Sequence, residues 1–227
     1  MGRCPFFLIW PVWCLLVFLL AGGHGAMVWP SPSPCDPTQG FKRLPLNSSN
    51  FHVHSPYDLP VAQRYVAVHG VHTLWALASD KPFKVHSPTA PRSEIKIQGY
   101  DYSSGVWQFE GHAYVPSGTS GVCIMQVFGA TSRATTLMLR VYNGALMYYR
   151  SLLVADDIYG RWFRVNVIHD VEGRTVKVFI NSVLRLTVDD HGGASHYFKF
   201  GVYGQNGSSY FMESRWKAIK VFKKWQV

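Results

Sequence analysis

Short segments in which apolar and polar residues alternate recur through almost the whole chain after residue 48. Turn clusters separate them at a spacing of about 8–12 residues, which is typical of a β-sandwich or a β-barrel. No window shows a convincing helical period over three turns. The sequence therefore predicts one all-β domain in which any helix is short.

The expected strands lie near residues 49–54, 64–69, 72–78, 92–98, 105–115, 121–128, 134–142, 145–153, 162–169, 174–180, 183–188, 196–203 and 212–222. Asn143-Gly144 lies between LMLRVY and ALMYYR and is the strongest hairpin signal in the chain. Val171-Glu172-Gly173 and Asn181-Ser182 mark two further turns between strands.

The first 26 residues have the pattern of a secretory signal peptide. Arg3 precedes an apolar stretch from Phe6 to Leu20, and small residues follow at Gly22, Gly23, Gly25 and Ala26. The apolar stretch is shorter than the roughly 20 residues that span a membrane. We therefore expect a signal peptide over 1–26, a Pro- and Ser-rich extended arm over 27–46, and a single domain over 47–227, without stable membrane insertion.

Removing the signal peptide leaves Cys35 and Cys123. In an oxidising compartment two cysteines most simply form one disulfide, with two buried free thiols as the alternative. Asn47-Ser48-Ser49 and Asn206-Gly207-Ser208 fit the N-glycosylation pattern, and Asn47, in a polar loop, is the better candidate. The mature protein is expected to be a monomeric glycoprotein.

The formal net charge of +9 suits an anionic partner, such as a polyuronate, an organic acid or an anionic lipid. Nucleic acid is not expected, because RNP-like aromatic motifs, zinc-finger spacings and lysine-rich blocks are absent from the sequence. His52 and His54 share one strand face and could hold a metal, but no acidic residue or Cys lies near them in sequence. We therefore predict neither a metal site nor a cofactor.

Three expected strands carry polar side chains at alternate positions, which a strand projects to one face. These side chains are Arg92, Glu94, Lys96 and Gln98 in PRSEIKIQGY, Gln126 in GVCIMQVFG, and Tyr197, Lys199, Tyr203 and Gln205 in HYFKFGVYGQ. Cationic groups bind carboxylates, while amides and phenols bind or stack on sugars. Taken together, the three strands favour a concave groove that binds a carboxylate or a sugar. Taken singly, each strand could instead turn its polar side chains to solvent on an outer face.

The segments Arg92-Ser93-Glu94-Ile95-Lys96, Gln126-Val127-Phe128 and YFKFGVYGQ (197–205) resemble, in order, the three signature strands of the family 7 polysaccharide lyases. These alginate lyases have a jelly-roll fold, a β-sandwich of two antiparallel sheets like that of concanavalin A. DPTQGFKRLPLNSSNF, GVHTLWALASDKP and the stretch over 99–130 are similar to a plant secretory branch of that family, the citrate-binding proteins. The resemblance implies citrate binding and a vacuolar location, with the cell wall as the alternative.

The resemblance also implies roles for single residues. Arg92 and Gln126 correspond to groups that neutralise a uronate carboxylate. Tyr203 corresponds to the tyrosine that acts as the acid and sometimes also as the base, and Lys199 lies beside Tyr203. Phe128 stands where the family has a histidine, and phenylalanine can neither accept a proton nor hydrogen-bond a carboxylate. The sequence therefore favours a binding function over catalysis.

The preferred hypothesis is a binder of citrate, of another small polycarboxylate or of an acidic oligosaccharide, with a possible role in citrate transport or storage. Its ligand-binding residues would be Arg92, Lys96, Gln126, Lys199, Tyr203 and Gln205. A weak or altered polyuronate lyase that uses Tyr203, Arg92, Gln126 and Lys199 is the second hypothesis. A cell-wall glycan-binding protein is the third.

Overall fold

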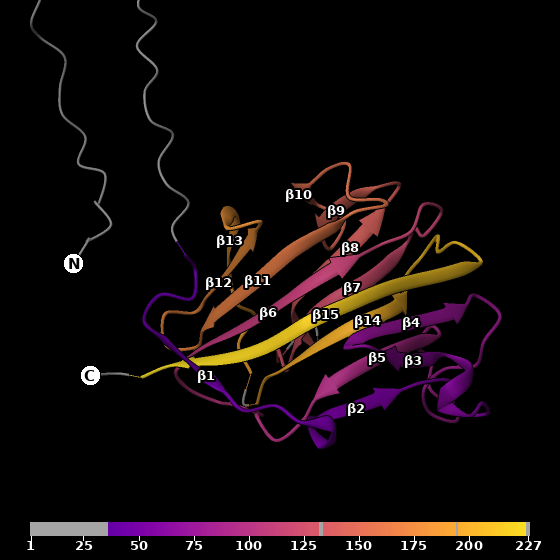
Figure 1. Ribbon diagram of the computed structural model, residues 1–227, viewed down its shortest axis with the longest axis horizontal. Helices are drawn as coiled ribbons and strands as arrows, with labels where there is room; N and C mark the ends of the chain where they lie inside the picture. The colour runs from indigo at the N-terminus through magenta and orange to yellow at the C-terminus, as the bar shows by residue number, and fades with distance from the viewer. Residues whose placement is uncertain (1–35, 132–133, 194, 226–227) are drawn as a thin grey trace, which may run out of the picture. The chain divides into compact units, whose positions relative to one another are not determined.

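The computed structural model describes residues 36–131, 134–193 and 195–225, which form two sheets of antiparallel strands (Figure 1). The first sheet has the order β13 (Val183–Asp189), β12 (Thr175–Ile180), β11 (Trp162–Asp170), β6 (Val106–Tyr114), β15 (Phe211–Lys224), β4 (Val71–Leu77), β3 (Tyr65–Val68), and β1 (Phe41–Leu44) also pairs with β15. The second sheet has the order β10 (Leu152–Ala155), β9 (Ala145–Tyr148), β8 (Thr135–Tyr142), β7 (Val122–Phe128), β14 (Tyr197–Gly204), β5 (Arg92–Ile97), β2 (Phe51–His54).

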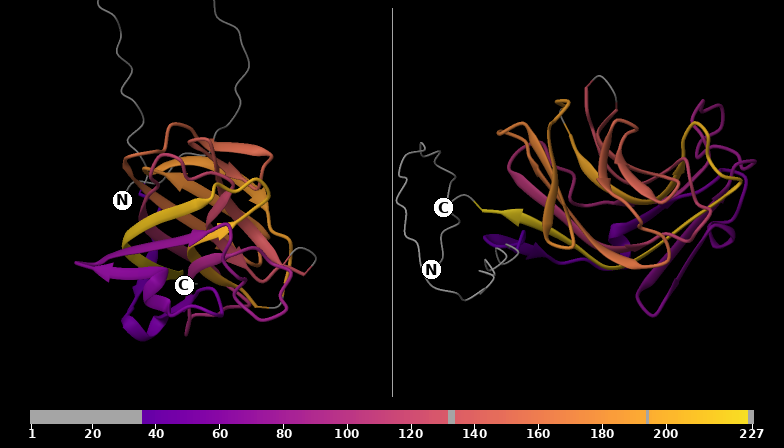
Figure 2. Two further views of the ribbon diagram at one scale, coloured as in Figure 1. Left: turned by 90° about the vertical axis from the view of Figure 1, so that its right-hand side faces the viewer. Right: turned by 90° about the horizontal axis from the view of Figure 1, so that it is seen from above.

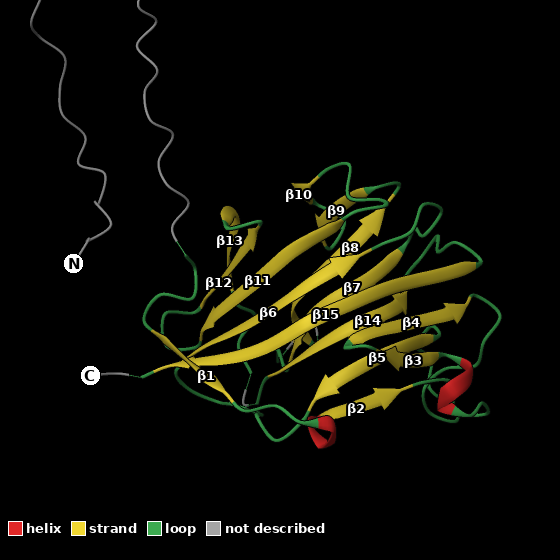
Figure 3. Ribbon diagram, in the orientation of Figure 1, coloured by secondary structure: helices red, strands yellow, loops and turns green. Residues whose placement is uncertain are grey.

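The described helices are two single turns of 3-10 type, η1 (Ser48–Asn50) and η2 (Val61–Gln63) (Figure 3). Figure 2 shows the strands as curved layers seen from two further sides. The predicted all-β sandwich of two antiparallel sheets is therefore confirmed. Within the described ranges, no helix is long and apolar enough to cross a membrane.

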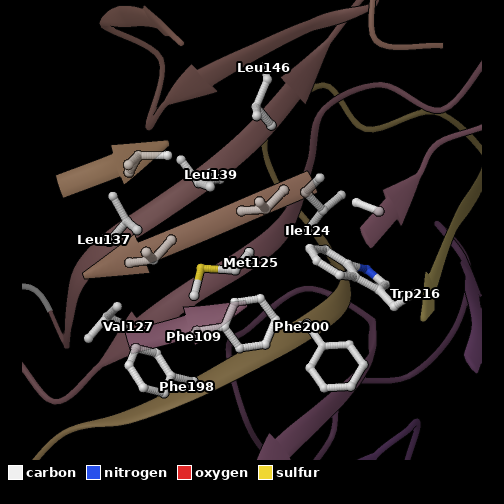
Figure 4. Packing of buried hydrophobic residues seen from close by; sticks show 14 of the residues in the cluster. Phe109, Ile124, Met125, Val127, Leu137, Leu139, Leu146, Phe198, Phe200 and Trp216 are labelled. Carbon is white, nitrogen blue, oxygen red and sulfur yellow. The ribbon is translucent and has the colours of Figure 1, made fainter. Parts of the chain in front are cut away.

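Alternation along the strands builds the core between the sheets. On β14, Phe198, Phe200 and Val202 are buried, and the residues between them point to the opposite face. The ring of Phe200 lies 5.9 Å from that of Phe109 on β6 and 5.5 Å from that of Trp216 on β15, so aromatic contacts join the two sheets (Figure 4). The second sheet consequently turns the polar positions of its strands away from the core.

The hairpins occur where the turn residues predict them. Asn143 and Gly144 both have positive φ, 50° and 84°, and connect β8 to β9 with Tyr142 opposite Ala145. Asn181 and Ser182, with φ of 49° and 67°, connect β12 to β13 in the same way. Two positive φ values are the mark of the hairpin turn whose twist matches that of the strands.

Two segments differ from the expectation. Phe41–Leu44, placed in the extended arm, forms β1 and pairs with Val221–Lys224 of β15. The segment 145–153 divides into β9 and β10, because the chain reverses at Tyr149, which has a φ of 50°. Both strands are only four residues long and depend on pairing with a distant or neighbouring strand rather than on a strong local pattern.

The predicted Cys35–Cys123 disulfide is contradicted at Cys123, the one of the two cysteines that the structure describes. Cys123 is a buried free thiol on β7, and its Sγ donates a hydrogen bond to the carbonyl of Met125 at 3.2 Å. Burial, together with the charge of Glu94, raises the pKa of the Cys123 thiol. Cys35 and the signal peptide predicted over 1–26 lie outside the described residues.

Candidate functional site

The three strands that carry the polar motifs are direct neighbours, in the order β7-β14-β5 (Figure 1). On β14, Lys199 pairs with Gln126 on one side and with Lys96 on the other. Further along the same two strands, Tyr203 of β14 pairs with Arg92 of β5. The pairing register therefore brings the predicted residues of three distant segments to one face of the second sheet.

A buried carboxylate, Glu94, lies at the centre of this face. It accepts a hydrogen bond from Arg92 Nη1 at 3.2 Å, one from Lys199 Nζ at 3.4 Å and one from the Gln126 side-chain amide. Glu94 is 1% exposed and the Lys199 side chain 3% exposed, so the network is shielded from water. Three of the predicted ligand donors are thus already bonded to one acid, which lowers the positive charge that they offer to a ligand.

Glycine at position 201 permits a close approach of β14 to β5. Gly201 lies opposite Glu94 and has a φ of +140°, which L residues rarely adopt. A Cβ at this position would come within 2.4 Å of the Ser93 carbonyl oxygen. Glycine therefore lets β14 run close to the backbone of β5 beside Glu94, and Gln126 on β7 reaches Glu94 across β14.

Aromatic rings border the network. The rings of Phe128 and Tyr197 stack, with centroids 4.9 Å apart, and Lys199 Nζ lies 5.2 Å from the centroid of Phe128. Lys96 Nζ lies 3.9 Å from the centroid of Tyr197 and also donates to Asp101 at 2.7 Å. Burial is the main cause that raises the pKa of Tyr197 to about 12, so its hydroxyl stays protonated. The contacts of Lys199 with Phe128 and of Lys96 with Tyr197 are cation–π contacts. The Phe128 ring has no atom that can accept a proton.

Tyr203 and Gln205 complete the predicted set. The Arg92 guanidinium carbon lies 3.7 Å from the centroid of the Tyr203 ring, a close stack. Gln205 donates from Nε2 to the carbonyl oxygens of Tyr203 and Gly204, at 3.2 and 2.9 Å. Its side-chain nitrogen is therefore partly engaged by the backbone.

Three adjoining cavities lie over this face. The histidine cavity, of about 460 Å³, is lined by His52, His54, Phe83, Lys84, Ser87, Thr89, Arg92, Lys96, Gln98, Phe128, Tyr197 and Lys199. The central cavity, of about 460 Å³, is lined by Thr89, Arg92, Gln126, Phe128, Ala134, Thr135, Met138, Arg140, Tyr149, Tyr203 and Gln205. The arginine cavity, of about 520 Å³, is lined by Pro88, Thr89, Ala90, Arg140, Tyr142, Arg150, Tyr203, Gly204, Gln205 and Asn206. Because neighbouring cavities share lining residues, they form one groove across β2, β5, β14, β7 and β8.

Several groove residues were not predicted. His54 packs face to face on Phe83, with centroids 4.1 Å apart, and burial together with the charges of Lys199 and other cations lowers its pKa to about 3. The i, i+2 spacing of His52 and His54 placed them on one face, but nothing local connects β2 to the motif strands. Arg140 lies on β8 and Arg150 follows β9, so both are outside the three motifs. Their position depends on strand order alone.

Among the described residues, no cluster of three or more His, Cys, Asp or Glu could hold a metal ion. Asn47 and Asn206 are both exposed, and Asn47 caps η1 by accepting from the backbone N–H of Ser49 at 2.9 Å. Asn206 is also part of the arginine cavity wall.

A family model described as alginate lyase matches residues 44–223, which is most of the chain. The chain belongs to the alginate lyase family. It is also similar to a citrate-binding protein from Hevea brasiliensis, with 58% identity over 189 residues that cover 83% of this chain and 79% of the relative.

Solved alginate lyases share the fold at low sequence identity. The enzyme from Corynebacterium sp. is 16% identical, with a TM-score of 0.59, over 79% of this chain and 91% of that chain. The family 7 alginate lyase A1-II' in complex with substrate (GGMG) is 15% identical, with a TM-score of 0.61, over 79% of this chain and 95% of that chain. The resemblance inferred from the three motifs is therefore confirmed, as is the jelly-roll fold of the family.

Proposed function

We propose that this member of the alginate lyase family is a binding protein for citrate or a related polyanion, and not an efficient lyase. The observation that carries the proposal is the environment of Phe128, the residue that stands at the histidine position of the lyase motif. Its ring stacks on Tyr197, and the ammonium group of Lys199 lies near both rings, so Phe128 supplies a wall to the groove. The similarity to a citrate-binding protein supports the same conclusion.

The charge of the groove fits an anionic ligand. Its cavities are lined by the cationic side chains Lys84, Arg92, Lys96, Arg140, Arg150 and Lys199. The acids bonded to this set among the described residues are Glu94 and Asp101. The excess of positive charge raises the affinity for carboxylates and speeds their approach.

The lyase alternative requires a base for the uronate C5 proton and an acid for the leaving O4. A positioned general base contributes about 10²–10⁴-fold to a rate, and phenylalanine cannot act as one. Tyr203 keeps the alternative open, because its ring is held by Arg92 and it lines both the central and the arginine cavities. In that mechanism the deprotonated Tyr203 oxygen takes the C5 proton, and the electrons of the C5–H bond form a C4=C5 double bond as the C4–O4 bond breaks. The proton on Tyr203 then passes to O4.

Calorimetry of residues 27–227 with citrate, malate and oligouronates, at acidic and at neutral pH, tests the proposal. Saturable binding of citrate with no unsaturated uronate product from polymannuronate or polyguluronate is the expected result. Turnover that disappears in Tyr203→Phe would establish the lyase instead. Binding of cell-wall glycans without citrate binding would favour the glycan-binding hypothesis.

We further propose that the protein follows the secretory pathway to the vacuole, as a monomeric glycoprotein that serves citrate transport or storage. The N-terminal pattern over 1–26 supports entry to that pathway. Imaging of a fluorescent fusion at the C-terminus, with and without residues 1–26, would separate the vacuole from the cell wall.

A further inference from the structure

The arginine cavity differs in its charge balance from the rest of the groove. No Asp or Glu lines any of the three cavities among the described residues. The cationic residues of this cavity, Arg140 on β8 and Arg150 after β9, also form no ion pair with a described acid. At the motif end of the groove, Arg92 and Lys199 are bonded to Glu94, and Lys96 is bonded to Asp101. The positive charge that is not balanced by an acid therefore lies outside the three motifs.

Aromatic rings hold both guanidinium groups in place. Arg140 Cζ lies 5.0 Å from the centroid of Tyr149, and Arg150 Cζ lies 4.8 Å from the centroid of Tyr142. Stacking leaves the edge of a guanidinium, which carries its N–H groups, available for an acceptor.

The donors of Arg140 are poorly satisfied. Its Nη2 donates to Met138 Sδ, a weak acceptor, at 3.1 Å, and its Nε is buried without a hydrogen-bond partner in the part of the chain that the structure describes. A buried donor without an acceptor costs free energy, and a carboxylate that accepts from the same guanidinium recovers part of that cost. The Nε of Arg92 also lacks a partner among the described residues, but Arg92 Nη1 already donates to the buried carboxylate of Glu94, whereas Arg140 donates to no carboxylate.

We infer that Arg140 and Arg150 form the primary carboxylate-binding compartment of the groove. A guanidinium binds a carboxylate through two parallel N–H···O bonds, and Gln205, Asn206 and Tyr203 in the same cavity offer polar groups to neighbouring hydroxyls. This inference rests on the proposed binding of a polycarboxylate, and it names the point at which that ligand is held. The carboxylate can come from a free acid such as citrate or from one unit of a uronate chain.

The two sources differ in how far they extend. Citrate is small enough to occupy the arginine cavity alone. A uronate chain held there would continue into the central cavity, which shares Thr89, Arg140, Tyr203 and Gln205 with it, and would reach Arg92.

Calorimetry with citrate on Arg140→Gln, Arg150→Gln and Arg92→Gln tests the inference. We expect a weakening of about 10- to 100-fold for each of the first two variants, which is the effect of losing a charged hydrogen bond, and a smaller loss for Arg92→Gln. Arg185→Gln, an exposed arginine of β13 in the other sheet, is the matched control and should bind as the wild type does. With an oligouronate, Arg92→Gln should also weaken binding, because a chain reaches both ends.

A second measurement does not depend on variants. Phenylglyoxal modifies accessible arginines, and peptide mass spectrometry locates the modified sites. Citrate should protect Arg140 and Arg150 and leave the modification of Arg185 unchanged. Citrate binding that survives in both Arg140→Gln and Arg150→Gln but is lost in Arg92→Gln would overturn the inference and leave the proposed function intact. A wild-type protein that binds neither citrate nor oligouronates would overturn both.

Discussion

The side-chain amide of Gln126 donates a hydrogen bond to the buried carboxylate of Glu94, across the strand that lies between them. The two residues are 32 positions apart in the chain and lie on β7 and β5, the two strands that flank β14. The same carboxylate also accepts from Arg92 and Lys199. Glu94 therefore orients three residues that the motifs suggested would act directly on a ligand.

Glu94→Gln should destabilise the protein and increase the effect of an anion. The change leaves Arg92 and Lys199 buried without their acid, and breaking such a pair costs about 3–5 kcal/mol. Because an oligouronate that reaches Arg92 would replace part of the missing charge, it should raise the melting temperature of Glu94→Gln more than that of the wild type. Thermal unfolding with and without an oligouronate measures both effects.

Glu213→Gln is the matched control for that experiment. Glu213 pairs with Arg215 at 2.6 Å, and the Glu213 and Arg215 side chains are 13% and 44% exposed, so the pair is open to water on its arginine side. Exposed pairs contribute about 1 kcal/mol or less, so this variant should unfold close to the wild type. Equal stability of Glu94→Gln and Glu213→Gln would contradict the central role of the Glu94 network.

Phe128→His should raise lyase activity. A histidine at this position would lie beside Tyr197 and Lys199 in the central and histidine cavities and could accept a proton or bond a uronate carboxylate. We expect a gain of about 10²-fold in the formation of unsaturated uronate, the lower end of what a positioned base supplies. The double variant with Tyr203→Phe should lose the gain. Unchanged turnover in a folded Phe128→His protein that still binds oligouronates would show that more than this residue separates the chain from a lyase.

His54 should make the protein less stable in acid. Burial and the neighbouring charges of Lys199, His52, Arg92 and Lys96 lower its pKa to about 3, whereas the unfolded chain keeps the ordinary value of 6.5. Between these values the unfolded state binds a proton that the folded state does not, so the contribution of His54 to stability is complete above pH 6.5 and is lost as the pH falls toward 3.

His54→Phe keeps a ring against Phe83 and removes the titration. Urea unfolding at several pH values from 4 to 7 should therefore give a shallower dependence of the unfolding free energy on pH for the variant. Burial also lowers the pKa values of His72, His112, His169 and His196, so part of the dependence should remain. Parallel curves for the two proteins would contradict the buried, neutral state of His54.

Cys123 should be unreactive in the native protein. Its thiol is buried and has a raised pKa, and alkylation requires the thiolate. Iodoacetamide should modify Cys123 in denaturant without a reductant, and leave it unmodified in native buffer. Modification in denaturant only after reduction would show that Cys123 is paired, as the cysteine count had suggested.

The sequence was sufficient for the local features of the fold. Alternation and β-branched residues predicted most of the strands, and Asn143-Gly144 and Asn181-Ser182 predicted their hairpins, because these signals depend on neighbours in the chain. The strands β1 and β10 were not predicted as separate strands. Pairing with the distant β15 defines β1, and the reversal at Tyr149 separates β10 from β9.

The motifs also predicted which side chains leave the core. The period of two along each strand placed Arg92, Gln126, Lys199 and Tyr203 on polar faces, and the order of the motifs pointed to one family. Both inferences need only the linear sequence, without knowledge of which strands pair.

Only the tertiary structure decided what those side chains contact. The register between β5, β14 and β7 made Glu94 the shared partner of Arg92, Gln126 and Lys199, and the strand order brought His54 to one end of the groove and Arg140 with Arg150 to the other. A strand pattern fixes the face on which a residue lies, but its neighbours on that face come from segments tens of residues away. The pairing of those segments depends on burying the whole core at once, and no local stretch of the sequence contains it.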